Sequence, residues 1–175
     1  FTLDLETSGL DHYNPESYIN CVGMWLPQAA TAWVLPVRKS PTLPVNWPGE
    51  ILKWMSAQKI PVINQNYKFD SLWLLNKFQV SFFNTDDTML SHYMIDENSP
   101  HGLKENARYW LGAPDYDLTS SEKKGNTYAK KLFTYCAWDA YYTYQLKKLF
   151  SRELMKDQET RNLYKFLMMP ASRMY

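Results

Sequence analysis

The 175-residue chain is long enough to bury one sizeable core, and its hydrophobic share of 45% is ordinary for a globular protein. A formal net charge of +1 excludes a globally basic surface, so any nucleic acid must be bound by a local patch or through metal ions. No apolar run approaches a membrane span and no signal peptide is visible, which predicts a cytoplasmic protein without a membrane partner. Cys21 and Cys136 lack the spacing of disulfide frameworks or metal sites, so we expect reduced, packed thiols.

Three strands are predicted at the start of the chain. Residues 1–6 alternate apolar and acidic side chains, as in a half-buried strand, so Asp4 and Glu6 share one face of it. Residues 19–26 and 31–35 follow as strands, separated by a short turn. Together the three strands predict an antiparallel meander.

Two helices with a short strand between them are predicted next. The first begins near Pro48, because proline suits the first turn of a helix, and the second covers residues 70–78. The strand covers residues 61–64. The apolar residues predicted to face the core are Ile51, Trp54 and Met55 from the first helix, and Leu72, Trp73, Leu75 and Phe78 from the second.

The second half of the chain predicts mainly helices. Asp86 or Asp87 can cap a helix that runs to about residue 95, and a further helix covers about 102–112. Residues 113–127 are polar and rich in Asp, Ser and Lys, and we expect a mobile loop there.

A long helix over about 133–150 places Tyr135 and Asp139 four residues apart, on one helical face. A charged, helical segment over 151–175, broken at Pro170, completes the chain. Strands followed by alternating helices and strands indicate an α/β protein with a mixed central sheet and flanking helices. The ribonuclease H-like architecture is such a sheet, and it places acids from the first strand and from later helices at one rim.

Four carboxylates and one phenol carry the predicted chemistry: Asp4, Glu6, Asp70, Asp139 and Tyr135. Clustered acids repel each other, so a fold that brings them together normally holds cations between them. Their oxygen atoms suit Mg²⁺ or Mn²⁺ rather than zinc, and two such ions are a standard apparatus for breaking phosphodiester bonds. We predict that Asp4 bridges two ions and that Glu6 and Asp139 complete the coordination sphere of the first ion. Asp70 would hold the second ion, directly or through water, and Tyr135 would orient the attacking water.

Three motifs resemble the 3′–5′ proofreading exonuclease domain of family A DNA polymerases, the kind found in bacterial DNA polymerase I and phage relatives. The first resembles Asp-x-Glu-Thr-x-x-Leu-Asp, over residues 4–11, and the second resembles Gln-Asn-x-Lys-Phe-Asp, over residues 65–70. The third is Tyr-x-x-x-Asp, over residues 135–139, which is typical of the tyrosine branch of the DEDD superfamily. We expect the exonuclease domain to cover residues 1–150 and a helical connector into a polymerase module to cover 151–175.

The resemblance implies an enzyme that removes 3′-terminal nucleotides from single-stranded or frayed DNA and releases nucleoside 5′-monophosphates. It implies proofreading for a polymerase in the same parent polypeptide, in a bacterial or phage-infected cell. The four carboxylates would bind two Mg²⁺ or Mn²⁺ ions, and Tyr135 would position the nucleophile. The substrate-binding residues that it implies are Thr7, Leu10, Asn66 and Lys68.

Other interpretations remain open from the residues alone. A ribonuclease D-type RNA-processing exonuclease shares the motifs, although the polymerase-like tail over 163–175 argues against it. The chain could also be a non-catalytic module that binds single strands and retains the exonuclease motifs. The four intact acids argue against this interpretation. Lys130 and Lys131 are candidates for contacts to the DNA backbone, whereas Lys123 and Lys124 fit a solvated charge run slightly better. The chain starts without Met on an apolar run and ends without a helix cap, so we expect a piece of a larger polypeptide.

Overall fold

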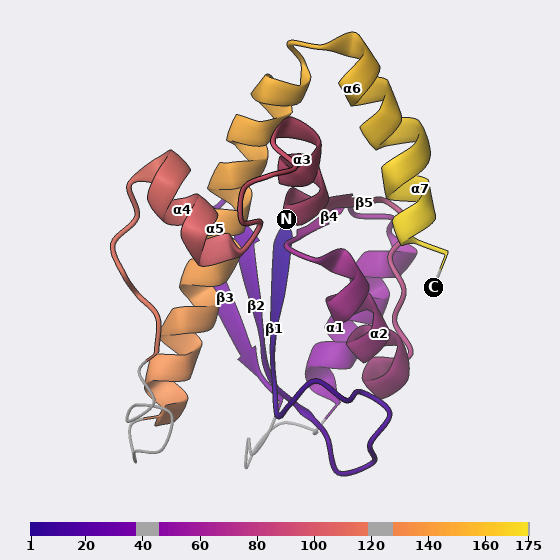
Figure 1. Cartoon of the computed structure of the whole chain (residues 1–175). Coiled ribbons are helices and arrows are strands. Elements are labelled where there is room, and N and C mark those ends of the chain that lie inside the picture. Colours follow the sequence, from indigo (N-terminus) through magenta and orange to yellow (C-terminus); the bar gives the residue numbers. More distant parts are fainter. Residues whose placement is uncertain (38–45, 119–127, 175) are drawn as a thin grey trace.

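The computed structural model describes residues 1–37, 46–118 and 128–174 (Figure 1). Five strands form one mixed sheet in the order β3-β2-β1-β4-β5. β1, β2 and β3 pair antiparallel, which confirms the predicted meander, and β4 and β5 add in parallel beyond β1. The strands are β1 (Thr2–Thr7), β2 (Ile19–Leu26), β3 (Thr31–Pro36), β4 (Val62–Asn64) and β5 (Thr85–Asp87).

Helices cover both faces of the sheet, so the protein has the predicted α/β, ribonuclease H-like architecture. α1 and α2 lie on one face, and the long α5 crosses the other with α4 beside it (Figure 1). The helices are α1 (Trp47–Ala57), α2 (Tyr67–Phe78), α3 (Thr88–Ile95), α4 (Leu103–Leu111), α5 (Tyr128–Leu154), α6 (Gln158–Leu163), the π-helical turn η2 (Tyr164–Met168) and α7 (Met169–Ser172). Among the described residues, no helix combines the length and the apolar composition that crossing a membrane requires.

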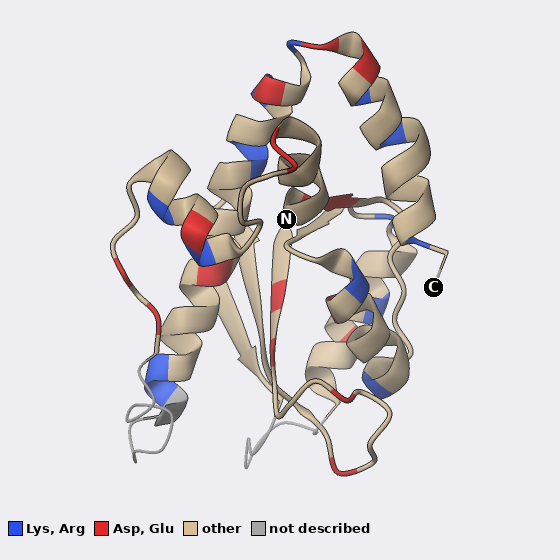
Figure 2. Cartoon of the chain, viewed as in Figure 1, with Lys and Arg blue, Asp and Glu red and all other residues tan. Residues whose placement is uncertain are grey.

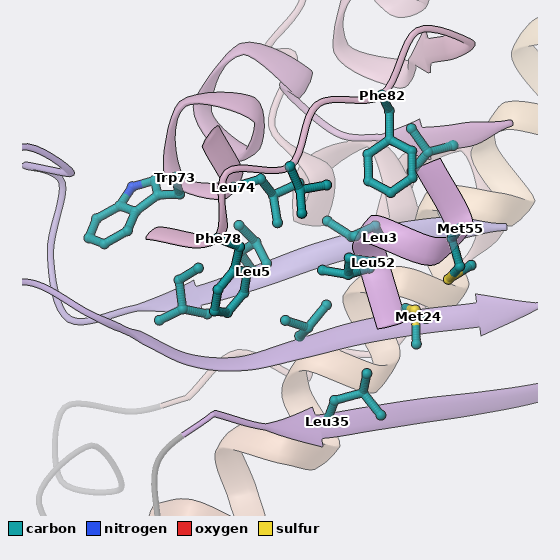
Figure 3. Close-up of a cluster of buried hydrophobic side chains, with 14 of the residues drawn as sticks. Leu3, Leu5, Met24, Leu35, Leu52, Met55, Trp73, Leu74, Phe78 and Phe82 are labelled. Carbon is teal, nitrogen blue, oxygen red and sulfur yellow. The ribbon is translucent and has the colours of Figure 1, made fainter. Parts of the chain in front are cut away.

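The main core fills the space between the sheet and the pair α1 and α2 (Figure 3). Leu3 and Leu5 of β1 face this core, because alternate residues of a strand point to the same side. Leu52 of α1 and Trp73 and Leu74 of α2 meet them there, all nearly or fully buried. Met55, Trp73 and Phe78 are therefore buried as predicted.

The predicted core stripe of α1 is wrong at two positions. Trp54 is 61% exposed and Ile51 lies at the surface, whereas Leu52 is fully buried. The reason is the contact at the start of the helix, where Gly49 lies against the ring of Phe78 and sets which side of α1 faces inward. On α2, Leu75 is likewise exposed and Leu74 takes the buried position.

α5 lies unusually close to β1 and β2 because small residues face each other there. Cys136 and Ala140 of α5 are fully buried, and the hydroxyl of Thr2 donates a hydrogen bond of 2.6 Å to the carbonyl of Ala140. A Cβ atom on Gly23 of β2 would lie only 2.6 Å from the sulfur of Cys136. This close approach places one side of α5 directly over the acidic face of β1.

Asp87 caps two helices at once, which confirms it as the predicted cap of α3. Its carboxylate accepts hydrogen bonds from two backbone N–H groups of α3, those of Met89 and Leu90. It also accepts from the backbone N–H groups of Asn66 (3.0 Å) and Tyr67 (2.8 Å) at the start of α2. The end of β5 thereby fixes the position of the first turn of α2.

The C-terminal segment packs back onto β5. The phenol of Tyr164 hydrogen-bonds to Asp86, and the guanidinium of Arg173 donates to the side chain and carbonyl of Thr85 at 2.7 and 2.9 Å. The predicted break at Pro170 is wrong, because the helical path continues through it. The N–H of Met169 bonds five residues back to Tyr164, and this wider turn accommodates the proline ring.

Two other boundaries differ from the prediction. α5 extends from Tyr128 to Leu154, several residues further at each end than expected. Residues 113–118 have no regular secondary structure, as predicted, but the remainder of the expected mobile loop, 119–127, lies outside the described residues. Lys123 and Lys124 fall in that part of the chain.

Candidate active site

β1 supplies the first two acids. The alternation that buries Leu3 and Leu5 directs Asp4 and Glu6 to the opposite face, where both are partly buried under α5. The pairing with β2 shifts register between Glu6 and Thr7, so a bulge ends the regular strand beside the second acid.

α2 supplies the third acid from its first turn. Asn66 precedes the helix in a left-handed conformation (φ 63°), and Asp70 lies 3% exposed in the turn that follows. The amide of Asn64, at the end of β4, donates a hydrogen bond of 2.8 Å to Oδ2 of Asp70. The other amide atom, Oδ1 of Asn64, is buried and has no hydrogen-bond partner among the described residues.

α5 supplies the fourth acid and the phenol. Asp139 is 4% exposed and Tyr135, one turn earlier, is partly buried on the same side of the helix. Figure 2 shows acidic residues on β1 and on the middle of α5, with a basic residue of α4 beside the latter.

The electrostatics show that these groups lie within reach of one another. Burial and the charge of Asp139 raise the pKa of Asp4 to about 7. Burial and the charges of Asp4, Asp87 and Glu6 raise the pKa of Asp70 well above its usual value. The pKa of Tyr135 is raised by burial and by the charges of the surrounding acids, so its phenol stays protonated. The structure thus brings together all five residues that the sequence predicted for the chemistry.

Cys136 lies among these acids, but it is a poor ligand for a hard cation. Its sulfur, together with one oxygen each of Asp4 and Glu6, forms a group of atoms within 4.8 Å of one another. The Sγ–H group of Cys136 donates a hydrogen bond to Oδ2 of Asp4, with a distance of 3.5 Å between sulfur and oxygen. A hydrogen bond with Cys21 and burial raise the pKa of the thiol, so it stays protonated. Oxygen atoms therefore dominate the donor set, which fits Mg²⁺ or Mn²⁺.

Two side chains that the sequence reasoning missed hold Asp139. Lys104 of α4 forms a salt bridge with Oδ2 of Asp139, and Tyr116 donates a hydrogen bond of 2.8 Å to Oδ1. Neither has a fixed spacing from Tyr135 or Asp139 in the sequence, so no periodic pattern could have identified them. Burial raises the pKa of Asp139, and the charge of Lys104 opposes that shift.

The predicted substrate-binding residues lie around the ends of β1 and α2. Leu10 follows β1 and is 83% exposed, while the hydroxyl of Thr7 donates to the carbonyl of Gly9 at 2.7 Å. Asn66 is partly exposed and Lys68 is exposed at the start of α2. No contact to a substrate tests these assignments, which stay predictions.

A groove of about 530 Å³ runs beside Tyr135. Its lining includes the rings of Tyr116 and Trp138, the basic side chains of Lys130 and Lys131, and the acidic side chains of Asp115 and Asp117. A larger groove of about 820 Å³ lies between β2, β3 and α5, but the described residues that line it are mainly apolar and include no carboxylate. Of these two grooves, the smaller one has Tyr135 in its lining.

Comparisons with known proteins agree with this geometry. The sequence profile of the 3′–5′ exonuclease family matches residues 1–155. No curated protein sequence matches the chain. Among solved structures, Brucella melitensis NrnC bound to pGG is 22% identical with a TM-score of 0.72, covering 98% of this chain and 81% of that chain. Brucella melitensis NrnC with bound Mg²⁺ is 23% identical with a TM-score of 0.69, covering 98% and 82%.

A polymerase structure is similar too. The POL domain of Pol1 from M. smegmatis, in complex with DNA primer-template and dNTP, is 13% identical with a TM-score of 0.69. The match covers 98% of this chain but only 26% of that chain. At these identities the structural likenesses establish the fold, and the profile match establishes the family. The chain belongs to the 3′–5′ exonuclease family of the family A DNA polymerase type, with a domain of the DEDD kind.

Proposed function

We propose that this chain removes 3′-terminal nucleotides from DNA by phosphodiester hydrolysis and proofreads for a DNA polymerase. The observation that carries the proposal is the convergence of four acids from β1, α2 and α5, of which Asp4, Asp70 and Asp139 have raised pKa values. Such a concentration of carboxylates at neutral pH calls for bound cations to balance it. The family match supports DNA as the substrate.

The four acids, Asp4, Glu6, Asp70 and Asp139, are the ligands that would hold two Mg²⁺ or Mn²⁺ ions. When bound, such ions supply an activated water and stabilise the charge on the leaving 3′ oxygen. Asn64 keeps Asp70 in place through the hydrogen bond to Oδ2. Tyr135 remains a neutral phenol, so it orients the water by hydrogen bonding rather than by accepting its proton.

The groove beside Tyr135 suits a single strand. The rings of Tyr116 and Trp138 offer stacking faces, and Lys130 and Lys131 offer charge for the phosphate backbone. Exposed Leu10 would pack against the terminal base. The remaining predicted contacts near the scissile end are Thr7, Asn66 and Lys68.

In this proposal residues 1–150 form the exonuclease domain, and residues 151–175 lead into a polymerase module of the same parent polypeptide. The likeness to a Pol1 structure supports that arrangement, since this chain matches a quarter of a longer chain there. The product would be a nucleoside 5′-monophosphate, and the enzyme would act in the cytoplasm of a bacterial or phage-infected cell.

RNA is a second candidate substrate, and one observation favours it. The chain covers 81 to 82% of the NrnC chains but only 26% of the polymerase chain. One of the NrnC structures is bound to pGG. A 3′–5′ exonuclease that degrades RNA would use the same acids and the same groove. The site residues alone therefore do not distinguish the two substrates.

The test is a degradation assay on matched 5′-labelled single-stranded DNA and RNA in the presence of Mg²⁺ or Mn²⁺. We expect a ladder of shortened DNA products, abolished by EDTA and by Asp4→Asn. The matched control is Glu50→Gln, which changes an exposed acid of α1 that pairs with Lys53. Absence of any shortening with either metal would overturn the exonuclease proposal. Faster shortening of RNA than of DNA would show that RNA is the preferred substrate.

A further inference from the structure

The ammonium group of Lys104 lies inside the acidic site rather than at the surface. It forms a salt bridge with Oδ2 of Asp139, in which the two side chains are only 15% and 5% exposed. The same nitrogen lies 4.2 Å from the ring centroid of Tyr135 and 5.4 Å from that of Tyr116. Three residues of the site therefore surround this one cation.

Both carboxylate oxygens of Asp139 have a protein donor. Lys104 bonds to Oδ2, and the phenol of Tyr116 donates to Oδ1 at 2.8 Å. A divalent ion uses carboxylate lone pairs as ligands, and its charge repels an ammonium group at contact distance. Lys104 and a metal ion bound to Asp139 are thus competitors for the same oxygen.

We propose that Lys104 is a built-in counter-ion, which neutralises Asp139 before metal binds and which a divalent ion must displace. The inference rests on the proposed function, in which Asp139 is a metal ligand. Its consequence is that Lys104 sets how tightly the site binds metal. A lower metal affinity would be the cost of keeping a buried carboxylate paired in the metal-free protein.

The surroundings of Lys104 give the displaced ammonium a place to go. The faces of Tyr135 and Tyr116 attract a cation without using any lone pair of Asp139. Both rings also line the groove beside the site, so the ammonium can leave Asp139 and still remain near a phosphate in that groove. Metal binding therefore exchanges the partner of Lys104 without expelling its side chain into solvent.

The test measures Mn²⁺ binding to the metal-free protein by electron paramagnetic resonance, without substrate. Lys104→Met keeps the length of the side chain and removes the charge, and we expect it to bind Mn²⁺ at least about fivefold more tightly. Lys104→Arg keeps the charge and should retain the wild-type affinity. The matched control is Lys147→Met, which removes a similarly shielded salt bridge to Asp86, away from the site, and should leave the affinity unchanged.

Structural damage at the site would weaken metal binding, so a gain in affinity separates competition from misfolding. Lys104→Gln serves as the second variant if circular dichroism shows that Lys104→Met is unfolded. Wild-type protein that binds Mn²⁺ as tightly as these variants, or more tightly, would overturn the inference alone. If neither wild type nor the variants bind Mn²⁺, the proposed metal site itself is wrong and the inference falls with it.

Discussion

The side-chain amide of Asn64 joins three elements of the site. It donates a hydrogen bond of 2.8 Å to Oδ2 of Asp70 and a second of 2.9 Å to the backbone carbonyl of Leu3. The end of β4 is thus tied both to β1, which carries two of the acids, and to the first turn of α2, which carries the third. A buried residue outside the five predicted for the chemistry thus holds the relative position of these acids.

Replacing Asn64 should therefore affect stability and activity together. In Asn64→Leu the carboxylate of Asp70 and the carbonyl of Leu3 each lose a donor, and we expect a loss of about 1–3 kcal/mol in the free energy of unfolding. Exonuclease activity should fall as well, because Asp70 is no longer fixed. Denaturant unfolding and the nuclease assay measure the two effects. Asn76→Leu is the control, since that exposed amide donates a hydrogen bond to the carbonyl of His12. Equal losses in both variants would contradict the role of Asn64.

The close approach of α5 to the sheet predicts that Gly23 tolerates no side chain. In Gly23→Ala the new methyl group would meet the sulfur of Cys136 at 2.6 Å and its carbonyl oxygen at 2.7 Å, so the helix must shift. We expect destabilisation of about 1–3 kcal/mol by thermal or denaturant unfolding. Gly9→Ala is the control, because nothing lies within 4 Å of the position of its added methyl group. A Gly23→Ala protein as stable as wild type would show that α5 packs further from β2.

Tyr135→Phe tests the role of the phenol. We expect turnover to fall by up to about 100-fold, because the attacking water loses a group that orients it. The pH profile of the remaining activity should keep its shape, since the raised pKa of Tyr135 keeps the phenol neutral across the working range. Tyr144→Phe, on the same helix, should retain wild-type turnover. If Tyr135 acted as a base instead, wild-type turnover would rise with pH through the pKa of its phenol, and Tyr135→Phe would lose that rise.

The stability of the metal-free protein should depend on pH in an unusual direction. The pKa of Asp4 is raised from 3.8 to about 7, so between these values the folded protein binds more protons than the unfolded chain. The free energy of unfolding should consequently fall as pH rises from about 4 to about 7. Asp70 and Asp139, whose pKa values are also raised, act with the same sign. Denaturant unfolding in EDTA at several pH values measures this slope.

Two further measurements sharpen the pH prediction. Asp4→Asn removes one of the titrating groups, so its stability should fall less steeply over the same range. Mg²⁺ or Mn²⁺ should stabilise the wild-type protein more above about pH 7 than below it, because Asp4 is then ionised without metal. A stability that rises with pH in EDTA would contradict the raised pKa values of these acids, which burial causes first and mutual repulsion second.

Much of this site follows from local periodicity. The pleat of a strand puts Asp4 and Glu6 on one face whatever the rest of the fold does, and the helical repeat does the same for Tyr135 and Asp139. Asp70 shares no strand or helix with the other acids, so local periodicity could not place it beside them. The strand meander and the mixed sheet also follow from alternation and turn residues, so the fold class was predictable.

Other features depend on contacts between distant parts of the chain. Gly49 against Phe78 decides that Leu52 and not Trp54 faces the core, and no pattern within α1 contains that contact. The predicted break at Pro170 failed for a similar reason, because a wider helical turn accommodates the ring. Sequence periodicity identifies an apolar stripe on a helix. Which side of the helix faces the core depends on contacts with neighbouring helices and strands.

The sequence by itself determined which side chains we predict for the chemistry and which of them share an element, because backbone geometry fixes directions over a few residues. Only the tertiary structure decided what surrounds them. Lys104 and Tyr116 reach Asp139 from separate parts of the chain, 35 and 23 residues away. They meet it because small residues let α5 lie close to the sheet while α4 packs beside it. Such long-range packing depends on the volumes of many side chains together, so the spacing of residues within one strand or helix does not predict it.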